Sequence, residues 1–150
     1  MGTGRRFDVV GEADGITVID DYAHHPTKIK ATLAAARMRY PGRRVVAVWQ
    51  PHTYSRTRAL AADFIQSLEN ADLVIVSEIY ASREKPEAYS SKELVQQMDL
   101  RKALYIAGIP EISRYLIRHL IPGDVLVVLS AGDADQICRS VLSALEERKA

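Results

Sequence analysis

The sequence predicts an α/β fold, a doubly wound and mostly parallel sheet with helices on both faces. Short apolar runs alternate along the chain with segments whose apolar residues recur every three or four positions. The apolar runs are apolar throughout, as expected for strands that are covered on both faces. With 150 residues, of which 47% are apolar, the chain is long enough to bury a core as one domain spanning residues 1–150.

The first 21 residues predict a hairpin. Strands are expected at residues 7–10 and 16–19, joined by a turn at residues 12–15 and followed by Asp20 and Asp21. This hairpin adds an antiparallel N-terminal edge strand to the parallel sheet. The four further strands are expected at residues 45–49, 73–76, 103–106 and 125–129.

Five segments have helical spacing. The first begins at Pro26, and the second is expected as one helix capped by Ser55 or Thr57. Ser90 and Glu93 form a capping-box pattern that opens a short helix extending to Met98. The last two helices follow Pro110 and a cap at Asp133.

Composition excludes several classes of protein. The formal net charge is +1, which argues against general affinity for nucleic acid or an anionic membrane. No run approaches the roughly 18 apolar residues of a membrane span. The single cysteine, Cys138, lies in an apolar helical pattern and is expected to be buried, as in a cytoplasmic protein.

Unusual polar and aromatic residues follow four of the predicted strands. They occupy residues 20–26, 50–57, 77–84 and 130–133, whereas the opposite strand ends carry only turn residues. Ligands of open parallel sheets bind outside the carboxyl ends of the strands. The pattern therefore predicts one functional edge.

Histidines and an arginine are the candidates for chemistry at this edge. His24, His25, His52 and Arg56 suit the binding of an anion and the positioning of a reacting group. Adjacent histidines point apart in extended chain, so a shared metal ion is not expected. One of them instead caps the following helix while the other packs, or both bind ligand. Arg56 near a helix start opposes the helix dipole, which favours an anionic ligand there.

Weaker signals lie nearby. Asp20 and Asp21 are either turn acceptors or ligands of a ribose hydroxyl, and Gly132 with Asp133 either cradles an anion or forms the helix cap. Tyr80 on the long connection is either solvated or functional. No GxxxxGK followed by Ser or Thr occurs, and no GxGxxG follows a strand, so the chain does not hold a nucleoside triphosphate alone.

Three segments together resemble a known family. DDYAHHP at 20–26, QPHTYSRT at 50–57 and IYASRE at 79–84 are similar to the C-terminal domain of the Mur ligases. The resemblance runs from about Arg5 to the last helix. It implies a Rossmann-like, amino-acid-binding domain, with the UDP-sugar domain and the central ATPase domain absent from this chain.

The resemblance also implies a reaction. It is greatest to members that join L-alanine to UDP-N-acetylmuramate in peptidoglycan synthesis, using ATP and Mg through an acyl phosphate. Asp21 resembles the residue that contacts the ATP ribose, and Tyr22 and His24 lie where the nucleotide and alanine sites adjoin. Arg56, with His52 nearby, resembles the arginine that holds the amino-acid carboxylate. His25 and Tyr80 complete the substrate-binding candidates.

The chain departs from the family pattern in three places. Thr53 replaces an arginine that many relatives carry, Ser130 replaces a common glycine, and Glu78 replaces a frequent aspartate. More of the anion binding then rests on Arg56.

Two alternatives remain open. A sibling ligase that attaches a recycled tripeptide to UDP-N-acetylmuramate carries similar motifs. From another class, the chain is a stand-alone anion-binding α/β module without catalysis. A phosphate-loop domain upstream in the same reading frame would exclude the module.

Overall fold

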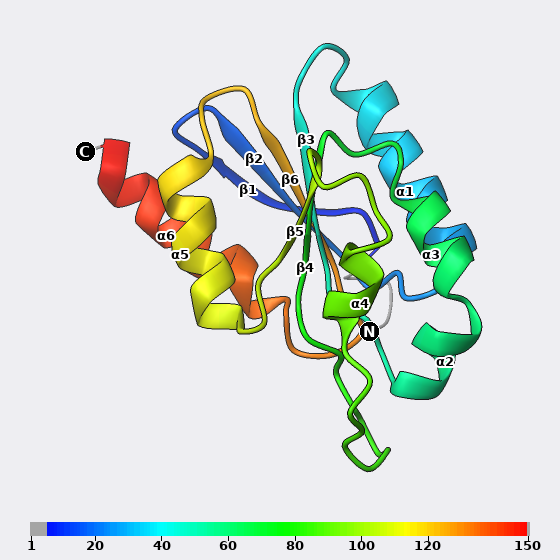
Figure 1. The fold of residues 1–150 in the computed structure, drawn as a ribbon. Coiled ribbons are helices and arrows are strands. Elements are labelled where there is room, and N and C mark those ends of the chain that lie inside the picture. Colours follow the sequence, from blue (N-terminus) through cyan, green and yellow to red (C-terminus); the bar gives the residue numbers. More distant parts are fainter. Residues whose placement is uncertain (1–5, 150) are drawn as a thin grey trace.

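The computed structural model describes residues 6–149 and contains one sheet flanked by helices (Figure 1). The strands are β1 (Asp8–Ala13), β2 (Ile16–Asp21), β3 (Val45–Trp49), β4 (Leu73–Val76), β5 (Ala103–Tyr105) and β6 (Val125–Leu129). The helices are α1 (Pro26–Arg39), α2 (Tyr54–Ala59), α3 (Ala61–Ser67), α4 (Ser91–Val95), α5 (Ile109–His119) and α6 (Gln136–Lys149). Arg5, where the family resemblance was expected to begin, lies outside the described residues. No helix within residues 6–149 is both long and apolar enough to cross a bilayer.

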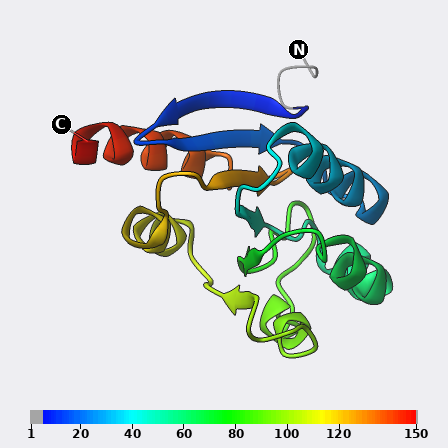
Figure 2. The same cartoon turned by 90° about the horizontal axis from the view of Figure 1, so that it is seen from above.

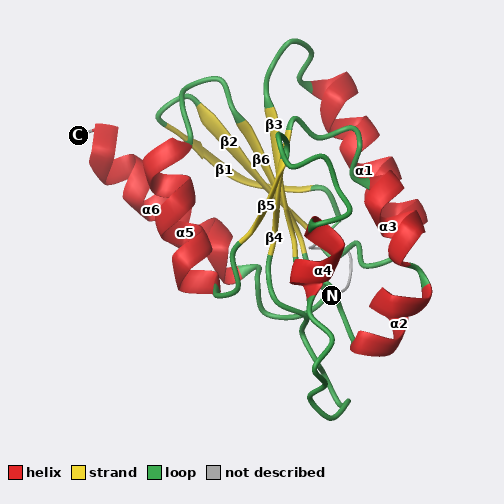
Figure 3. Ribbon diagram, in the orientation of Figure 1, coloured by secondary structure: helices red, strands yellow, loops and turns green. Residues whose placement is uncertain are grey.

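The strands lie in the order β1-β2-β6-β3-β4-β5, and the sheet is yellow in Figure 3. β1 pairs antiparallel with β2, and every other pairing is parallel. The predicted fold class is therefore confirmed, including the antiparallel edge strand. β6 separates β2 from β3, and this crossover brings three strand ends together at the centre of the sheet.

Helices cover both faces of the sheet (Figure 2). α1, α3 and α4 cover one face, where Leu33, Phe64 and Leu94 are buried against the sheet. α5 and α6 cover the other, where Leu116 and Val141 are buried. Alternate side chains of each apolar strand point into one or the other of these two cores. Both faces of the strands are therefore apolar.

The N-terminal hairpin is longer than predicted. β1 extends to Ala13, so the turn consists of Asp14 and Gly15 alone, with φ values of 53° and 74°. Two successive positive φ values match the right-handed twist of the flanking strands. A register shift between Val9 and Gly11 bends β1.

The predicted second helix is two helices, and the expected caps were wrong. The helical conformation is interrupted at Leu60, where φ is −114° and ψ is 22°. Thr53 caps α2, because its Oγ1 accepts a hydrogen bond from Arg56 N–H. Ser55 instead donates its hydroxyl to Glu84, and Thr57 donates to the Thr53 carbonyl.

The predicted caps of two other helices had opposite outcomes: one was confirmed and one was wrong. The capping box of Ser90 and Glu93 is confirmed, although α4 ends at Val95 rather than at Met98. The cap predicted at Asp133 is wrong, because α6 begins at Gln136. The Asp133 carboxylate accepts a hydrogen bond of 2.7 Å from the Gln50 amide instead. Cys138 is buried, as predicted.

Candidate functional site

The segments that follow β2, β3, β4 and β6 meet at one edge of the sheet. Hydrogen bonds join them past the strand ends: Gln50 N–H donates to Leu129 O, Ser130 N–H to Asp21 O, and Thr53 N–H to Tyr80 O. The connections after β3, β4 and β6 gather at the lower end of the molecule in Figure 1. The expectation of a single edge is confirmed.

Four aromatic rings form a continuous row across this edge. Tyr22 contacts His24, His24 contacts His52, and His52 contacts Tyr80, with centroid separations of 5.3, 5.9 and 5.7 Å. His52 and Tyr80 are stacked, and a parallel β-bridge joins their backbones. We call Tyr22, His24, His52 and Tyr80 the ring row. It links the ends of β2, β3 and β4.

The environment of His52 favours the neutral imidazole. Burial lowers the pKa of His52, and the charges of Arg56 and His24 lower it further, while Glu84 opposes them. Its Nδ1 atom is buried and has no hydrogen-bond partner among residues 6–149. A neutral ring beside a cation can bind an anion but adds no charge of its own.

Arg56 is the cation nearest this histidine along the chain. Its guanidinium makes no hydrogen bond or ion pair with any described residue, whereas Arg58 pairs with Glu87. Because α2 has only six residues, Arg56 lies in its last turn as well as near its start. Arg56 therefore does not oppose the helix dipole as predicted, and its guanidinium, unpaired among residues 6–149, is the better evidence for an anionic ligand.

His25 lies apart from the ring row. Its Nδ1 accepts a hydrogen bond of 3.3 Å from Thr27 N–H, and it forms the N-cap of α1. Of the two readings left open for the adjacent histidines, capping describes His25, whose ring is exposed. His24 is the histidine that contacts the other rings.

Asp21 is buried, and its carboxylate ties three segments together. It accepts hydrogen bonds from Ala23 N–H at 2.8 Å, Phe7 N–H at 2.9 Å and Thr32 Oγ1 at 3.0 Å. These contacts are those of a structural acceptor.

A cavity of about 290 Å³ lies beside Asp21. Tyr22 and His24 also line it. The cavity therefore brings together Asp21 and His24, the predicted nucleotide-binding residues, and Tyr22, which was predicted to lie where the nucleotide and alanine sites adjoin. Lys28 and Arg6 line it too and add positive charge that the sequence analysis had not singled out.

The backbone donors of Gly132 and Asp133 are already occupied. Gly132 N–H donates to Ser130 Oγ at 3.0 Å, and Asp133 N–H donates to Gln50 Oε1 at 3.2 Å. A Cβ at Gly132 would lie 2.7 Å from both Gln50 Oε1 and Tyr80 Cγ. This loop therefore closes around Gln50 and offers no open anion cradle in this arrangement.

Gln50 is a residue that the sequence analysis passed over. Its Oε1 also accepts from Ser130 Oγ at 2.7 Å and from Ala134 N–H at 3.2 Å. The sequence did contain a signal for Gln50, because its side-chain amide comes directly after a strand predicted to be buried.

The long connection between β4 and α4 is attached to α2 by Glu84. The carboxylate accepts from Tyr54 N–H at 2.6 Å and from the hydroxyl and N–H of Ser55. The Ser55 hydroxyl is the main reason that the pKa of Glu84 lies below its ordinary value. Glu84 therefore has a structural role, which is neither the solvated nor the functional role predicted for side chains of this connection.

Glu78 anchors the other end of the same connection. Tyr105 Oη donates to it at 2.6 Å, and Ser90 Oγ donates at 2.7 Å. Burial by itself raises the pKa of Glu78, but hydrogen bonds from Tyr105, Ile79, Ser90 and Ser91 outweigh it and lower the pKa.

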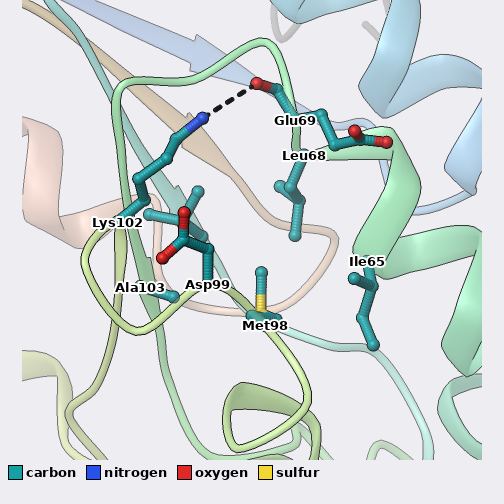
Figure 4. A pocket seen from close by; sticks show the side chains of 8 residues that line it. Ile65, Leu68, Glu69, Met98, Asp99, Lys102 and Ala103 are labelled. Atoms are coloured by element: carbon teal, nitrogen blue, oxygen red, sulfur yellow. Dashed lines mark hydrogen bonds between the residues drawn. The ribbon is translucent and has the colours of Figure 1, made fainter.

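A further cavity, of about 210 Å³, lies at the opposite edge of the sheet (Figure 4). Its lining is mainly apolar and includes Leu68 and Met98. Lys102 also lines it, and its Nζ donates to Glu69 O. It contains no predicted site residue. Within residues 6–149 no cluster of three or more His, Cys, Asp or Glu residues suits a metal ion.

Residues 5–132 match the family described as "Mur ligase, glutamate ligase domain". Since this match covers most of the chain, the chain belongs to that family.

Proteins with assigned activities are similar to this chain in sequence or in fold. The UDP-N-acetylmuramate–L-alanine ligase of Alkaliphilus metalliredigens is 47% identical over 144 residues, which are 95% of this chain and 31% of the relative. Solved structures of UDP-N-acetylmuramate–alanine ligase from Thermotoga maritima (TM-score 0.78, 25% identity) and of murein peptide ligase from Psychrobacter arcticus (TM-score 0.77, 26% identity) are also similar. They cover 96% and 95% of this chain, which in each case spans 30% of the solved chain.

Proposed function

We propose that this chain is the amino-acid-binding domain of an ATP-dependent ligase that joins L-alanine to UDP-N-acetylmuramate. The observation that carries the proposal is the guanidinium of Arg56 beside the ring row, which is unpaired among residues 6–149, in a chain 47% identical to a ligase with that activity. The chain spans about a third of that relative's length. We assign the UDP-sugar and ATPase domains to a longer protein of which this chain would form one part.

In the proposed reaction, the main role of this domain is to position one substrate. ATP converts the muramoyl carboxylate into an acyl phosphate and leaves as ADP. The alanine nitrogen attacks the carbonyl carbon, phosphate leaves with the C–O bonding electrons, and the nitrogen releases a proton to solvent. Arg56 would hold the alanine carboxylate through the guanidinium fork, which matches a carboxylate with two parallel hydrogen bonds. Fixing the amine against the acyl phosphate in this way is a proximity effect.

The nucleotide would meet this domain at the cavity beside Asp21. Lys28 and Arg6 suit the charge of a nucleotide, and Tyr22 and His24 offer ring faces. The Asp21 carboxylate already accepts three protein hydrogen bonds, so we assign it mainly to shaping this cavity. Mg and the triphosphate are assigned to the central ATPase domain, because this sequence lacks a phosphate loop. Dependence on ATP supports a cytoplasmic location for the reaction.

The tripeptide ligase is the second candidate. The murein peptide ligase of Psychrobacter arcticus matches this fold with a TM-score of 0.77, nearly that of the alanine ligase. The curated relatives favour alanine, because the ligase of Alkaliphilus metalliredigens is much closer in sequence, at 47% identity.

Phosphate release from ATP by the full-length protein tests the proposal. We expect release to require both UDP-N-acetylmuramate and L-alanine, and we expect the 150-residue chain alone to show no turnover. Phosphate release that depends on the tripeptide instead of L-alanine would indicate the activity of the tripeptide ligase. Turnover by the 150-residue chain alone would contradict the proposal that other domains bind ATP and the UDP-sugar.

A further inference from the structure

The two histidines of the ring row have different hydrogen-bonding surroundings. His24 Nδ1 lies 3.0 Å from the carbonyl oxygen of Tyr22. A carbonyl oxygen only accepts, so Nδ1 of His24 carries a proton. In the neutral ring Nε2 then has a free lone pair.

His52 has the opposite surroundings. Its Nδ1 is buried with no partner in the described part of the chain, so a proton there would be an orphaned buried donor. Placing the proton on Nε2 leaves only a lone pair unpaired at Nδ1, turns the N–H toward solvent or a ligand, and is also the tautomer that free histidine prefers. The ring is half-buried, and Nε2 is the nitrogen it leaves accessible. Burial and the neighbouring Arg56 lower the pKa of His52, so the ring is not doubly protonated near neutral pH.

We infer that His24 and His52 are held as opposite tautomers and read the two ends of an α-amino acid. Nε2 of His24 accepts a hydrogen bond from the substrate nitrogen, and the Nε2–H of His52 donates to the substrate carboxylate alongside Arg56. The ring centroids lie 5.9 Å apart, which allows one small zwitterion to bridge both rings. The assignment of a substrate rests on the proposed function, whereas the tautomers do not.

The other two histidines of the chain are internal controls for the tautomers. His119 Nδ1 lies 2.8 Å from Tyr115 O and must carry the proton, as in His24. His25 Nδ1 accepts from Thr27 N–H, so its proton lies on Nε2, as proposed for His52. Every histidine of the chain is thus assigned to one of two classes.

The first test is imidazole ¹⁵N NMR of the ¹⁵N-labelled chain at about pH 8, above the ordinary histidine pKa. Single His→Gln variants assign each ring. We expect His24 and His119 as Nδ1–H forms and His25 and His52 as Nε2–H forms. The same tautomer at His24 and His52, or an Nδ1–H form of His52, would overturn the inference whether or not the protein is a ligase.

The second test compares His52→Gln with His52→Asn in the full-length ligase. The glutamine amide reaches the position of Nε2 and keeps a donor there, whereas the asparagine amide reaches only the position of Nδ1. We expect Asn to raise the KM for L-alanine about tenfold and Gln to raise it less than about threefold. His119→Gln, on α5 away from the ring row, is the control and leaves KM unchanged. Equal losses in Gln and Asn would show that the donor role is wrong, and correct tautomers without alanine turnover would reject only the proposed function.

Discussion

Arg56 and Arg58 lie two positions apart on α2, yet only Arg58 has a carboxylate partner. Arg58 pairs with Glu87 and lies over the Tyr89 ring at 4.8 Å. Arg56 makes no such contact with residues 6–149. The difference gives a matched pair of variants on one helix.

We expect Arg56→Ala in the full-length enzyme to raise the KM for L-alanine about tenfold or more, because a charge-assisted hydrogen bond to a carboxylate contributes about 1.5–3 kcal/mol. Arg58→Ala is the control and should leave this KM near its original value. Steady-state kinetics with saturating ATP measure both. An unchanged KM in Arg56→Ala would remove this arginine from the alanine site.

Glu78 provides a pH-dependent test at the same scale. Its lowered pKa means that the folded state favours the carboxylate. The resulting stability is complete above the unfolded pKa, about 4.3, and is lost as pH falls through the lower folded value.

Glu78→Gln should therefore lower the free energy of unfolding by about 1–3 kcal/mol at neutral pH. The gap to the unmodified chain should shrink at about pH 3, where the native carboxyl also becomes protonated. Urea unfolding of both proteins at both pH values measures this difference in the free energy of unfolding. A gap that is constant with pH would mean that the ionised carboxylate contributes nothing.

At the scale of elements, the long connection acts on α2 through Glu84. The first N–H groups of a helix lack partners within the helix, and Glu84 supplies one to Tyr54 and Ser55. Thr53, the cap, has a φ of 67° and a ψ of 146°, a combination that costs about 1–3 kcal/mol for a residue other than glycine. The surrounding contacts therefore hold α2 in place against local strain.

We expect Glu84→Ala to accelerate hydrogen exchange of the Tyr54 amide, because the variant leaves this donor to water. Glu87→Ala removes a carboxylate from the same connection without touching that amide, and it should leave the rate unchanged. Amide exchange followed by NMR at one pH distinguishes them. Similar acceleration in both variants would show that the whole connection, rather than Glu84, protects α2.

At the scale of the whole molecule, Gly132 lets three connections meet. It lies against Gln50, which follows β3, and against Tyr80, which follows β4. Neither neighbour can retreat easily, since Gln50 is held by Ser130 and Asp133, and Tyr80 is stacked on His52.

Gly132→Ala should consequently destabilise the chain by about 1–3 kcal/mol, as overpacking does, and should shift the His52 ring resonances. Gly11→Ala is the control: its nearest neighbour is the flexible side chain of Leu142, at 3.2 Å. Urea unfolding and NMR spectra measure the two effects. If both glycine variants lose the same stability and the His52 signals stay in place, the connections are not coupled through Gly132.

Sequence reasoning predicted most of the fold because the signals are local. Apolar runs such as Val125–Leu129, the capping box at Ser90 and the helix start at Pro26 depend on residues a few positions apart. Predictions failed at Ser55, Thr57 and Asp133, where a partner distant in sequence takes the side chain or a competing cap forms.

The sequence by itself determined the alternation of strands and helices, the placing of unusual residues after strand ends, and the family. Only the tertiary structure decided which of them act together: it left Arg56 without a hydrogen-bond or ion-pair partner among residues 6–149, and it placed His24 against His52. The physical reason is the distance along the chain over which each interaction acts. Backbone preferences and apolar periodicity act between near neighbours in the chain, whereas burial and the contacts between side chains of different strand ends depend on segments that only the folded sheet brings together.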